Sequence, residues 1–269
     1  MCNFRYIKIK NIMLPITGIF DLFNGLIHQQ KKLKLKELPS QGVFYKDDFS
    51  IKIKKAKIED IIEYEHNFNK ENVYLVVESI KKVIKNNVVL PKGYVFEDIK
   101  SVDMIFIFLE IVKFTQNKKI NISYFDDNIS KMQEIEFSSK NFNYFDFSKF
   151  VRDSETAEIL VDDWRFSMPS IGIENCLTYY LLAKIKEKGE DDLSGYSFDF
   201  VFFSANKNKL TFNEMENLFE IFNYDIDEKD KRKITSIVDT FMKLVGYNLK
   251  IEGKIVEIKS KIDLEKIWK

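Results

Sequence analysis

The sequence is poor in the residues that most often mark a catalytic centre or a cross-linked fold. It has two cysteines, two histidines, four prolines and nine glycines among 269 residues. Two cysteines, one of them Cys2, cannot form a disulfide framework, so we expect a reduced, intracellular assembly environment. Because proline is rare while phenylalanine is abundant, with 25 copies, we expect a chain that is mostly ordered.

Motifs that carry chemistry are also missing. The sequence contains no Gly-x-Ser-x-Gly elbow, no Walker loop and no glycine-rich dinucleotide fingerprint. His28 and His66 lack Cys, Asp or His neighbours at metal-ligand spacing. Acidic runs at 126–127, 162–163 and 190–192 are typical of solvated loops, and "DIDEKD" at 225–230 lacks the central Gly of a calcium loop. We therefore expect no catalytic, cofactor or metal site and no small-molecule substrate.

No apolar run is long enough to cross a bilayer. The longest, "MIFIFLEIV" at 104–112, is interrupted by Glu110 and predicts a buried helix. The first twenty residues lack a basic start followed by an unbroken apolar core, so we expect no signal peptide. These features predict a chain without a membrane span.

The formal net charge is zero, but the charge is unevenly distributed. Residues 1–57 carry 12 basic and 4 acidic groups, whereas residues 145–230 carry 9 and 19, and residues 231–269 carry 10 and 5. Such an uneven distribution can orient a subunit among oppositely charged neighbours. It can also supply a basic face for nucleic acid, or it can be ordinary solvated surface.

Hydrophobic spacing predicts an α+β fold, with helices packed beside short antiparallel sheets and hairpins and an extended N-terminal arm. We expect three regions: the arm at 1–36, an α+β region at 37–150, and a mostly helical mixed region at 151–269. Strands are predicted at 4–10, 50–58 and 143–151, and hairpins at 119–127 with 131–137 and around Glu252-Gly253. Helices are predicted at 58–68, 71–87, 101–116 with Ser101 as N-cap, 173–188, 211–222 with a Thr-x-x-Glu capping box, and 229–246, before a last helical turn over "IDLEKIWK".

A short punctuated motif occurs three times. "ELPSQGVFYKDDF" at 37–49 has echoes in "MLPITGIFDLF" from Met13 and "SMPSIGIENCL" from Ser167. Proline presets φ for a turn and glycine supplies a positive φ or a close approach, after which β-branched and aromatic residues start an extended segment. The candidate turn and packing residues are Pro39, Gly42, Phe44, Tyr45, Pro169 and Gly172. The N-terminal arm adds aromatic side chains that could anchor an interface: Phe4, Tyr6, Phe20 and Phe23.

Taken together, residues 37 to about 125 resemble the T4-type bacteriophage baseplate hub family of hub subunits and hub-assembly proteins. The resemblance runs through "LPSQGVFYKDDFSIKIKKAKIEDIIEYE", "VESIKKVIKNNV" and "FEDIKSVDMIFIFLEIVKF", and "FSMPSIGIENCLTYYL" is similar to the same turn in the second half. It covers a third to half of the chain. It implies an assembly role without an active site, partners among other baseplate hub and wedge proteins, and a place in the virion tail baseplate after assembly in the host cytoplasm.

Three functional hypotheses follow. The first is a structural, non-enzymatic component of a contractile phage tail baseplate hub. The second is a non-virion assembly chaperone that binds a hub subunit and departs. The third is a nucleic-acid-binding protein that uses the basic N-terminal arm, although the chain has few arginines and no nucleic-acid-binding motif.

Overall fold

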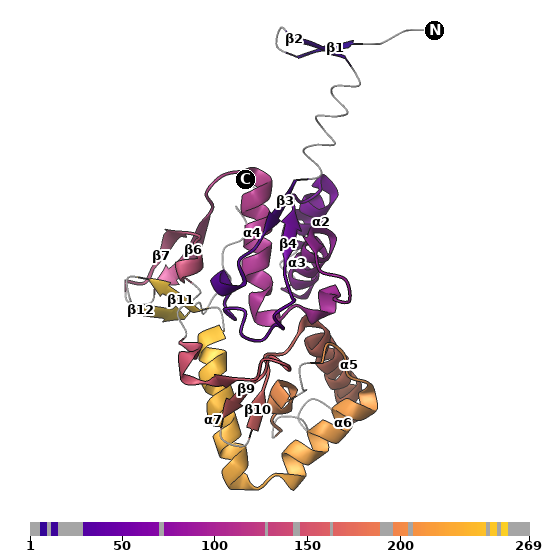
Figure 1. Ribbon diagram of the computed structural model, residues 1–269, viewed down its shortest axis with the longest axis vertical. Coiled ribbons are helices and arrows are strands. Elements are labelled where there is room, and N and C mark those ends of the chain that lie inside the picture. Colours follow the sequence, from indigo (N-terminus) through magenta and orange to yellow (C-terminus); the bar gives the residue numbers. More distant parts are fainter. Residues whose placement is uncertain are drawn as a thin grey trace.

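The computed structural model has an α+β fold with two lobes stacked along its long axis (Figure 1). It describes residues 6–9, 12–15, 29–69, 73–126, 129–141, 146–161, 164–188, 196–203, 207–245, 248–251 and 254–257. We define the N-terminal lobe as residues 29–141 and the C-terminal lobe as residues 146–245. Each lobe contains most of one cluster of buried apolar side chains. Ile171 of the C-terminal lobe belongs to the first cluster, and Phe44 of the N-terminal lobe belongs to the second.

The N-terminal lobe packs three helices beside a small antiparallel sheet. Strands β3 (Gln30–Lys32), β4 (Lys52–Lys54) and β5 (Val88–Val89) form the sheet in that order. The helices are α2 (Ile58–Asn69), α3 (Val73–Asn87) and α4 (Met104–Gln116), and β6 (Asn121–Asp126) pairs with β7 (Lys131–Glu136) as a hairpin. Short 3-10 turns complete the lobe: η1 (Leu35–Glu37), η2 (Phe96–Asp98), η3 (Ser101–Asp103) and η4 (Ser139–Asn141).

Helix α4 is the centre of this lobe, as the apolar run at 104–112 predicts. Its residues from Phe106 to Val112 are all buried, Glu110 included. The Glu110 carboxylate accepts a hydrogen bond at 2.6 Å from the ammonium of Lys31 on β3. A charged group thus sits in a buried helix because a strand supplies its counter-ion, and residues 30–32, which the sequence assigns to the arm, belong to the sheet.

Helix α2 turns Asp60 and Tyr64 toward the core rather than Ile58 and Ile62. Ile58 and Ile62 are exposed, while Tyr64 is 1% exposed and Asp60 is 5% exposed. The Asp60 carboxylate accepts hydrogen bonds from the side-chain amides of Asn86 and Asn87 at the end of α3. These two amides satisfy a carboxylate that burial would otherwise penalise.

The C-terminal lobe surrounds a second three-stranded sheet with helices. Strands β8 (Val151–Arg152), β9 (Ile159–Val161) and β10 (Trp164–Phe166) are antiparallel, with β9 in the middle. The helices are α5 (Ile171–Lys188), α6 (Phe212–Glu220), which continues as a π-helical turn η8 (Ile221–Asp225), and α7 (Glu228–Val245). The short turns η5 (Phe147–Lys149) and η7 (Asp199–Phe203) fill the space between them. Aromatic rings dominate this core, with Phe241 close to Phe147, Phe150 and Phe166.

Two local predictions are wrong. Of the strand predicted at 143–151, residues 147–149 form η5 instead, because Asp146 caps the turn by accepting the Ser148 amide at 3.0 Å. Ser101 is not the N-cap of α4; its hydroxyl donates to the Pro169 carbonyl oxygen at 3.2 Å. The capping box of α6 is confirmed, since Thr211 and Glu214 satisfy each other's amides. "DIDEKD" begins α7, and Asp227 caps the Asp230 amide at 2.9 Å.

The ends of the chain contribute two small hairpins. Strands β1 (Tyr6–Ile9) and β2 (Ile12–Pro15) pair antiparallel, as do β11 (Asn248–Ile251) and β12 (Lys254–Glu257). The second hairpin contacts η4 and the end of α7. The arm residues Phe4, Phe20 and Phe23, His28, the turn at Glu252-Gly253 and the helical turn predicted over "IDLEKIWK" lie outside the described residues.

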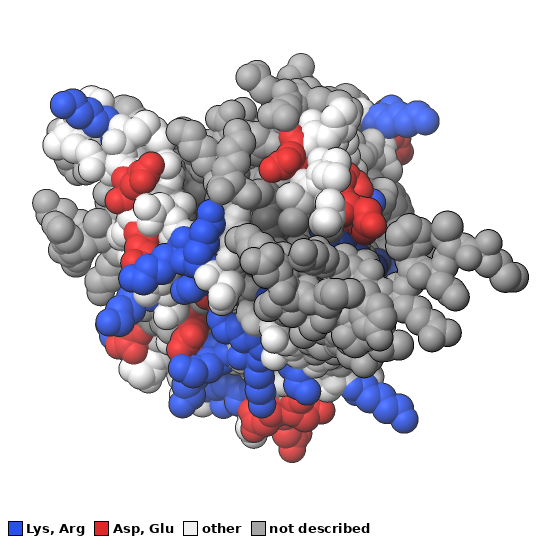
Figure 2. Space-filling model, turned by 90° about the horizontal axis from the view of Figure 1, so that it is seen from above, with Lys and Arg blue, Asp and Glu red and all other residues white. Residues whose placement is uncertain are grey.

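Lysines are concentrated at the start of the N-terminal lobe. Residues 29–57 carry nine lysines and three acidic residues. Figure 2, which looks down on this lobe, shows Lys and Arg side chains gathered on one side of the described surface with Asp and Glu among them. The visible surface is therefore mixed in sign rather than uniformly basic. Among the described helices, none has the length and apolar character needed to cross a membrane.

Candidate functional site: the interlobe junction

The Leu-Pro-Ser-x-Gly turn at 38–42 is fastened to the segment that leads into α4. The Ser40 amide donates to Asp103 Oδ1 at 2.8 Å, and the Ser40 hydroxyl donates to Asp103 Oδ2 at 2.7 Å. Gln41 and Gly42 both have positive φ, 53° and 76°, and a Cβ on Gly42 would lie 2.8 Å from the Leu35 Cβ. Glycine is therefore required at position 42 for its backbone conformation and for its close approach to η1.

The two aromatic residues after this turn enter different cores. The Phe44 ring packs edge-on against Phe147 of the C-terminal lobe, with 5.5 Å between ring centroids. The Tyr45 ring stacks on Phe49 in the N-terminal lobe at 4.3 Å. Phe44 is 1% exposed and Tyr45 is 3% exposed. Consecutive side chains thus insert into both lobes, which ties the turn to each of them.

Tyr45 also joins the polar network around Asp103. Its hydroxyl donates to Asp103 Oδ2 at 2.8 Å and accepts from the Lys100 amide at 2.9 Å. With the two bonds from Ser40, the buried carboxylate accepts three hydrogen bonds. Three well-placed donors are what a carboxylate needs in order to remain in a protein interior.

The second turn, at 168–172, approaches the same segment from the C-terminal lobe. The Pro169 carbonyl oxygen accepts from the Ser101 amide at 3.0 Å, and the Ile171 amide donates to the Ile99 carbonyl oxygen at 2.8 Å. The Lys100 ammonium donates to the Ser167 hydroxyl at 3.1 Å. Residues 99–101 are therefore held by the second turn, while Lys100 and Asp103 are held by the first.

Gly172 stands where the second turn meets another part of the C-terminal lobe. A Cβ at this position would lie 1.8 Å from the Asn208 carbonyl oxygen, a distance that no side chain tolerates. The Asn208 side chain donates in turn to Asp98 Oδ1 of η2 at 2.8 Å. The Ser170 hydroxyl accepts from the Ile173 amide at 3.2 Å in the first turn of α5. The turn is thus a close-packed crossing point between the lobes.

Arg152 on β8 adds a third connection. Its guanidinium donates to the carbonyl oxygens of Val43 and Tyr45, both at 2.7 Å, and to Asp47 Oδ1 at 3.1 Å. A planar guanidinium holds its donors in one fixed fork and can contact several acceptors at once. The C-terminal lobe therefore binds the backbone of the first motif directly through hydrogen bonds.

Burial changes the acid–base properties of the network. It raises the pKa of Asp103 to about 6, against the opposing effect of the hydrogen bonds from Ser40 and Tyr45. Burial also lowers the pKa of Lys100 to about 8, although the charges of Asp103 and Asp98 favour its ammonium form. The pKa of Tyr45 is raised by its burial and by the neighbouring Asp103 charge. At neutral pH the junction accordingly contains a buried carboxylate and a buried ammonium, each tied to neutral donors and acceptors.

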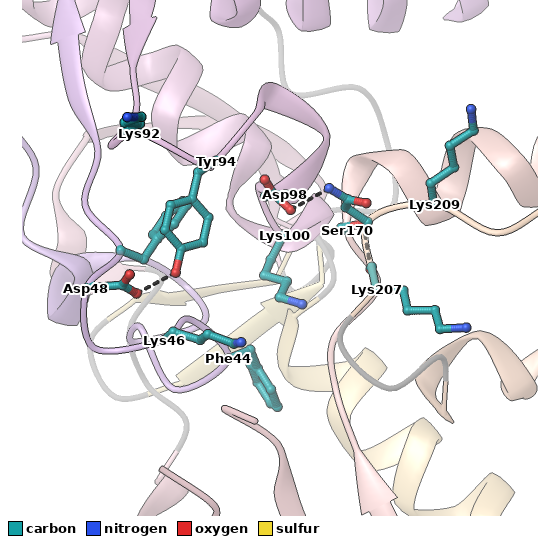
Figure 3. Close-up of a pocket in the computed structure, with 13 residues that line it drawn as sticks. Phe44, Lys46, Asp48, Lys92, Tyr94, Asp98, Lys100, Ser170, Lys207 and Lys209 are labelled. Atoms are coloured by element: carbon teal, nitrogen blue, oxygen red, sulfur yellow. Dashed lines mark hydrogen bonds between the residues drawn. The ribbon is translucent and has the colours of Figure 1, made fainter. Parts of the chain in front are cut away.

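A cleft opens on one side of this junction (Figure 3). Its cavity volume is about 500 Å³. The N-terminal lobe contributes Lys46, Asp48, Lys92, Tyr94 and Asp98 to its walls, and the C-terminal lobe contributes Ser170, Lys207, Asn208 and Lys209. Lys100 lies between the two walls. The walls are thus rich in ammonium groups and come from both lobes.

The six candidate turn and packing residues all lie at or beside this junction. Pro39, Gly42, Phe44 and Tyr45 belong to the first motif, and Pro169 and Gly172 belong to the second. Sequence reasoning missed the partners Lys100, Asp103 and Arg152, and it gave no role to Ser167, the first residue of the second motif. The serine shared by "LPSQG" and "MPSIG" is the one feature of the sequence that indicates side-chain hydrogen bonds in these turns.

The interface arm is not brought to this junction by any described contact. Of its four candidate residues, Tyr6 lies on β1, where its backbone pairs with Pro15, and the others fall outside the described residues.

Among the described residues, no group of three or more His, Cys, Asp or Glu side chains could hold a metal ion. No protein-family model matches the chain, and neither the curated proteins nor the solved structures that were compared with it give a match.

Proposed function

We propose that the chain is a structural component of a contractile phage tail baseplate hub and acts through protein–protein contacts with other hub and wedge proteins. The observation that carries the proposal is the convergence of its two Pro-Ser-x-Gly turns on residues 99–103. The first turn, with the strand and helices that follow it, is the strongest part of the resemblance to the baseplate hub family, and the second turn is similar to it. They serve a structural task here, because they fix one lobe against the other.

Exposed apolar side chains on both lobes support a role in assembly. Ile58 and Ile62, one turn apart on α2, are 73% and 59% exposed. Tyr179 and Leu182, on one side of α5, are 74% and 59% exposed. Single exposed apolar residues are ordinary, whereas neighbouring exposed apolar residues that form a continuous patch mark contact surfaces. A subunit with such a pair on one helix edge of each lobe suits an assembly in which it has neighbours on both sides.

Quantitative mass spectrometry of purified tails tests the proposal. Particles produced from the genome that encodes this chain should contain it in a fixed ratio to the other baseplate proteins. Presence in tail intermediates but absence from mature particles would instead identify an assembly chaperone. Absence from both would overturn the proposal.

The helix edges allow a sharper version of the same test. We expect Ile58→Ser with Ile62→Ser, or Tyr179→Ser with Leu182→Ser, to reduce incorporation into tails while leaving the thermal unfolding midpoint nearly unchanged. Val95→Ser is the control, since Val95 is an exposed apolar residue outside both edges, at 49% exposure. Normal incorporation of both double variants would show that these edges are not the contact surfaces.

A further inference from the structure

The cleft between the lobes carries an excess of positive charge. Five lysines line it, Lys46, Lys92, Lys100, Lys207 and Lys209, against two aspartates, Asp48 and Asp98, which leaves a formal charge of +3 on its walls. The lysines come from three separate stretches of the N-terminal lobe and from one stretch of the C-terminal lobe. The fold therefore gathers charges that are as much as 163 residues apart, from Lys46 to Lys209.

The two aspartates in the cleft are bound to neutral donors rather than to these lysines. Asp48 accepts from the Tyr94 hydroxyl, and Asp98 accepts from the Val95 amide at 2.6 Å and from the Asn208 side chain at 2.8 Å. Lys207 pairs with Glu214 at 3.1 Å, on α6. Within the described part of the chain, Lys46, Lys92 and Lys209 have no carboxylate within ion-pair distance. Three ammonium groups thus remain available to an external anion.

The close-up shows how these groups are placed (Figure 3). Lys100 and Lys46 point toward the middle of the cleft, whereas Lys207 and Lys209 extend outward on the opposite side. Lys100 is 2% exposed and is anchored by Ser167, so its ammonium has a fixed position. The exposed lysines have long, flexible stems that can follow a ligand along the cleft. The arrangement offers one fixed cation at the base and several adaptable ones around it.

We propose that this cleft binds a carboxylate-rich segment of a partner protein, a run of Asp and Glu residues lying between the two lobes. The identity of the partner as an assembly protein rests on the proposed function, but the charge and shape of the site do not. A cavity of about 500 Å³ accepts only a few residues at a time. A segment that lies across it meets lysines from both lobes.

The lining favours carboxylates of a protein over phosphates of a nucleic acid. No arginine lines the cleft. Single-stranded nucleic acid is held largely by exposed aromatic rings on which bases stack. Here Phe44 and Phe49 are buried, at 1% and 4% exposure, and the Tyr94 hydroxyl is engaged by Asp48. The two wall aspartates repel the evenly spaced charges of a phosphate backbone, whereas the carboxylates of a peptide can lie away from them.

Fluorescence anisotropy with a labelled octaglutamate peptide tests the site on the full chain. The variant Lys46→Gln with Lys92→Gln and Lys209→Gln should bind the peptide at least about tenfold more weakly than the wild type, because each lost ammonium removes a charge-assisted contact. The matched control is Lys52→Gln with Lys57→Gln and Lys131→Gln, which removes equal charge from exposed lysines outside the cleft. It should change affinity by less than about twofold. Equal losses in both variants would contradict a defined site.

Competing probes distinguish the ligand classes. Octaglutamine should not bind, and an eight-nucleotide single strand of thymidylate should compete less well than octaglutamate. Stronger competition by the oligonucleotide would overturn the assignment to protein carboxylates. Competition by citrate or inorganic phosphate at concentrations equal to the peptide would assign the site to a small anion and also overturn it.

The outcome is separable from that of the proposed function. If the wild type does not bind octaglutamate, the cleft proposal fails, whatever mass spectrometry finds in the tails. If the peptide binds at the cleft but the chain is absent from tails and their intermediates, the baseplate proposal fails and the cleft remains a site for acidic segments.

Discussion

Ser40 and Asp103 are joined by two hydrogen bonds across 63 residues of sequence. The Ser40 amide and hydroxyl donate to different oxygens of the same carboxylate, at 2.8 and 2.7 Å, and both residues are fully buried. This pairing orients the first Pro-Ser-x-Gly turn against the start of α4. The second turn reaches the neighbouring residues from the other lobe, so a short stretch of chain at 99–103 sets the geometry of the whole junction.

Removing the Asp103 carboxylate should destabilise the protein strongly. Asp103→Ala leaves three buried donors without their acceptor and creates a small cavity, so we expect the free energy of unfolding to fall by about 3 kcal/mol at pH 7. Urea unfolding followed by far-UV circular dichroism measures the change. Asp239→Ala, on an exposed face of α7, is the control and should leave stability nearly unchanged. Equal effects of the two substitutions would show that the hydrogen bonds to Asp103 do not contribute to the free energy of unfolding.

The same carboxylate should give stability a distinctive pH dependence. Its folded pKa of about 6 lies above the unfolded value of 3.8, so between about pH 4 and pH 6 the folded chain binds more protons at this group than the unfolded chain. The contribution of Asp103 to the free energy of unfolding therefore decreases as the pH rises through this window, by about 3 kcal/mol in all.

The variant Asp103→Asn, which cannot titrate, isolates this contribution. The difference in unfolding free energy, wild type minus variant, should decline from pH 4 to pH 6.5. Glu174, whose pKa burial also raises, is present in both proteins and cancels in the difference. Lys100 titrates near pH 8, outside the window. A difference that is flat, or that rises with pH, is incompatible with a raised pKa at Asp103.

A methyl group at position 172 should not fit. In Gly172→Ala the Cβ would meet the Asn208 carbonyl oxygen, so the backbones of α5 and of residue 208 have to separate. We expect a loss of about 3 kcal/mol in the free energy of unfolding, at the upper end of the range for overpacked positions. Gly93→Ala is the comparison, because φ is +94° there but no atom lies within 4 Å of the added Cβ. A smaller loss for Gly172→Ala than for Gly93→Ala would mean that backbone conformation, not contact, decides.

The stability of the protein should depend on the ion pair between Lys31 and the buried Glu110 carboxylate. Lys31→Met leaves the Glu110 carboxylate, whose side chain is 11% exposed, without its counter-ion. We expect the free energy of unfolding to fall by about 1–2 kcal/mol, a modest value because the lysine end is 41% exposed. Lys32→Met, one residue along β3 and exposed, should have little effect when both variants are measured by urea unfolding. No difference between the two variants would show that water satisfies Glu110 equally well.

Sequence patterns predicted local elements of the fold correctly in several places. The apolar run around Phe106, the capping box at Thr211 and the alternation at 131–137 each reflect interactions between residues close in sequence, and each appears in the structure. The same reasoning failed at 147–149, within the strand predicted at 143–151, where the Asp146 cap formed a 3-10 turn.

The junction could not be predicted from such patterns, because its contacts join residues that are far apart in the sequence. A serine at 40 gives no sign that its partner is an aspartate at 103, and Asp103 itself resembles an ordinary acidic residue in the first turn of the predicted helix. Ser101 fits the composition of an N-cap, yet a carbonyl from residue 169 takes its hydroxyl hydrogen bond. Only the repeated Pro-Ser-x-Gly order marked both turns, and it did so without showing that they meet.

Quantitative mass spectrometry of purified mature tails, from particles produced by the genome that encodes this chain, tests the proposed baseplate role most directly. If the chain is a structural component of the hub, it should be present in a fixed, stoichiometric ratio to the baseplate hub proteins. Its absence from mature tails, while those proteins are detected at full abundance, would contradict a structural role in the baseplate hub.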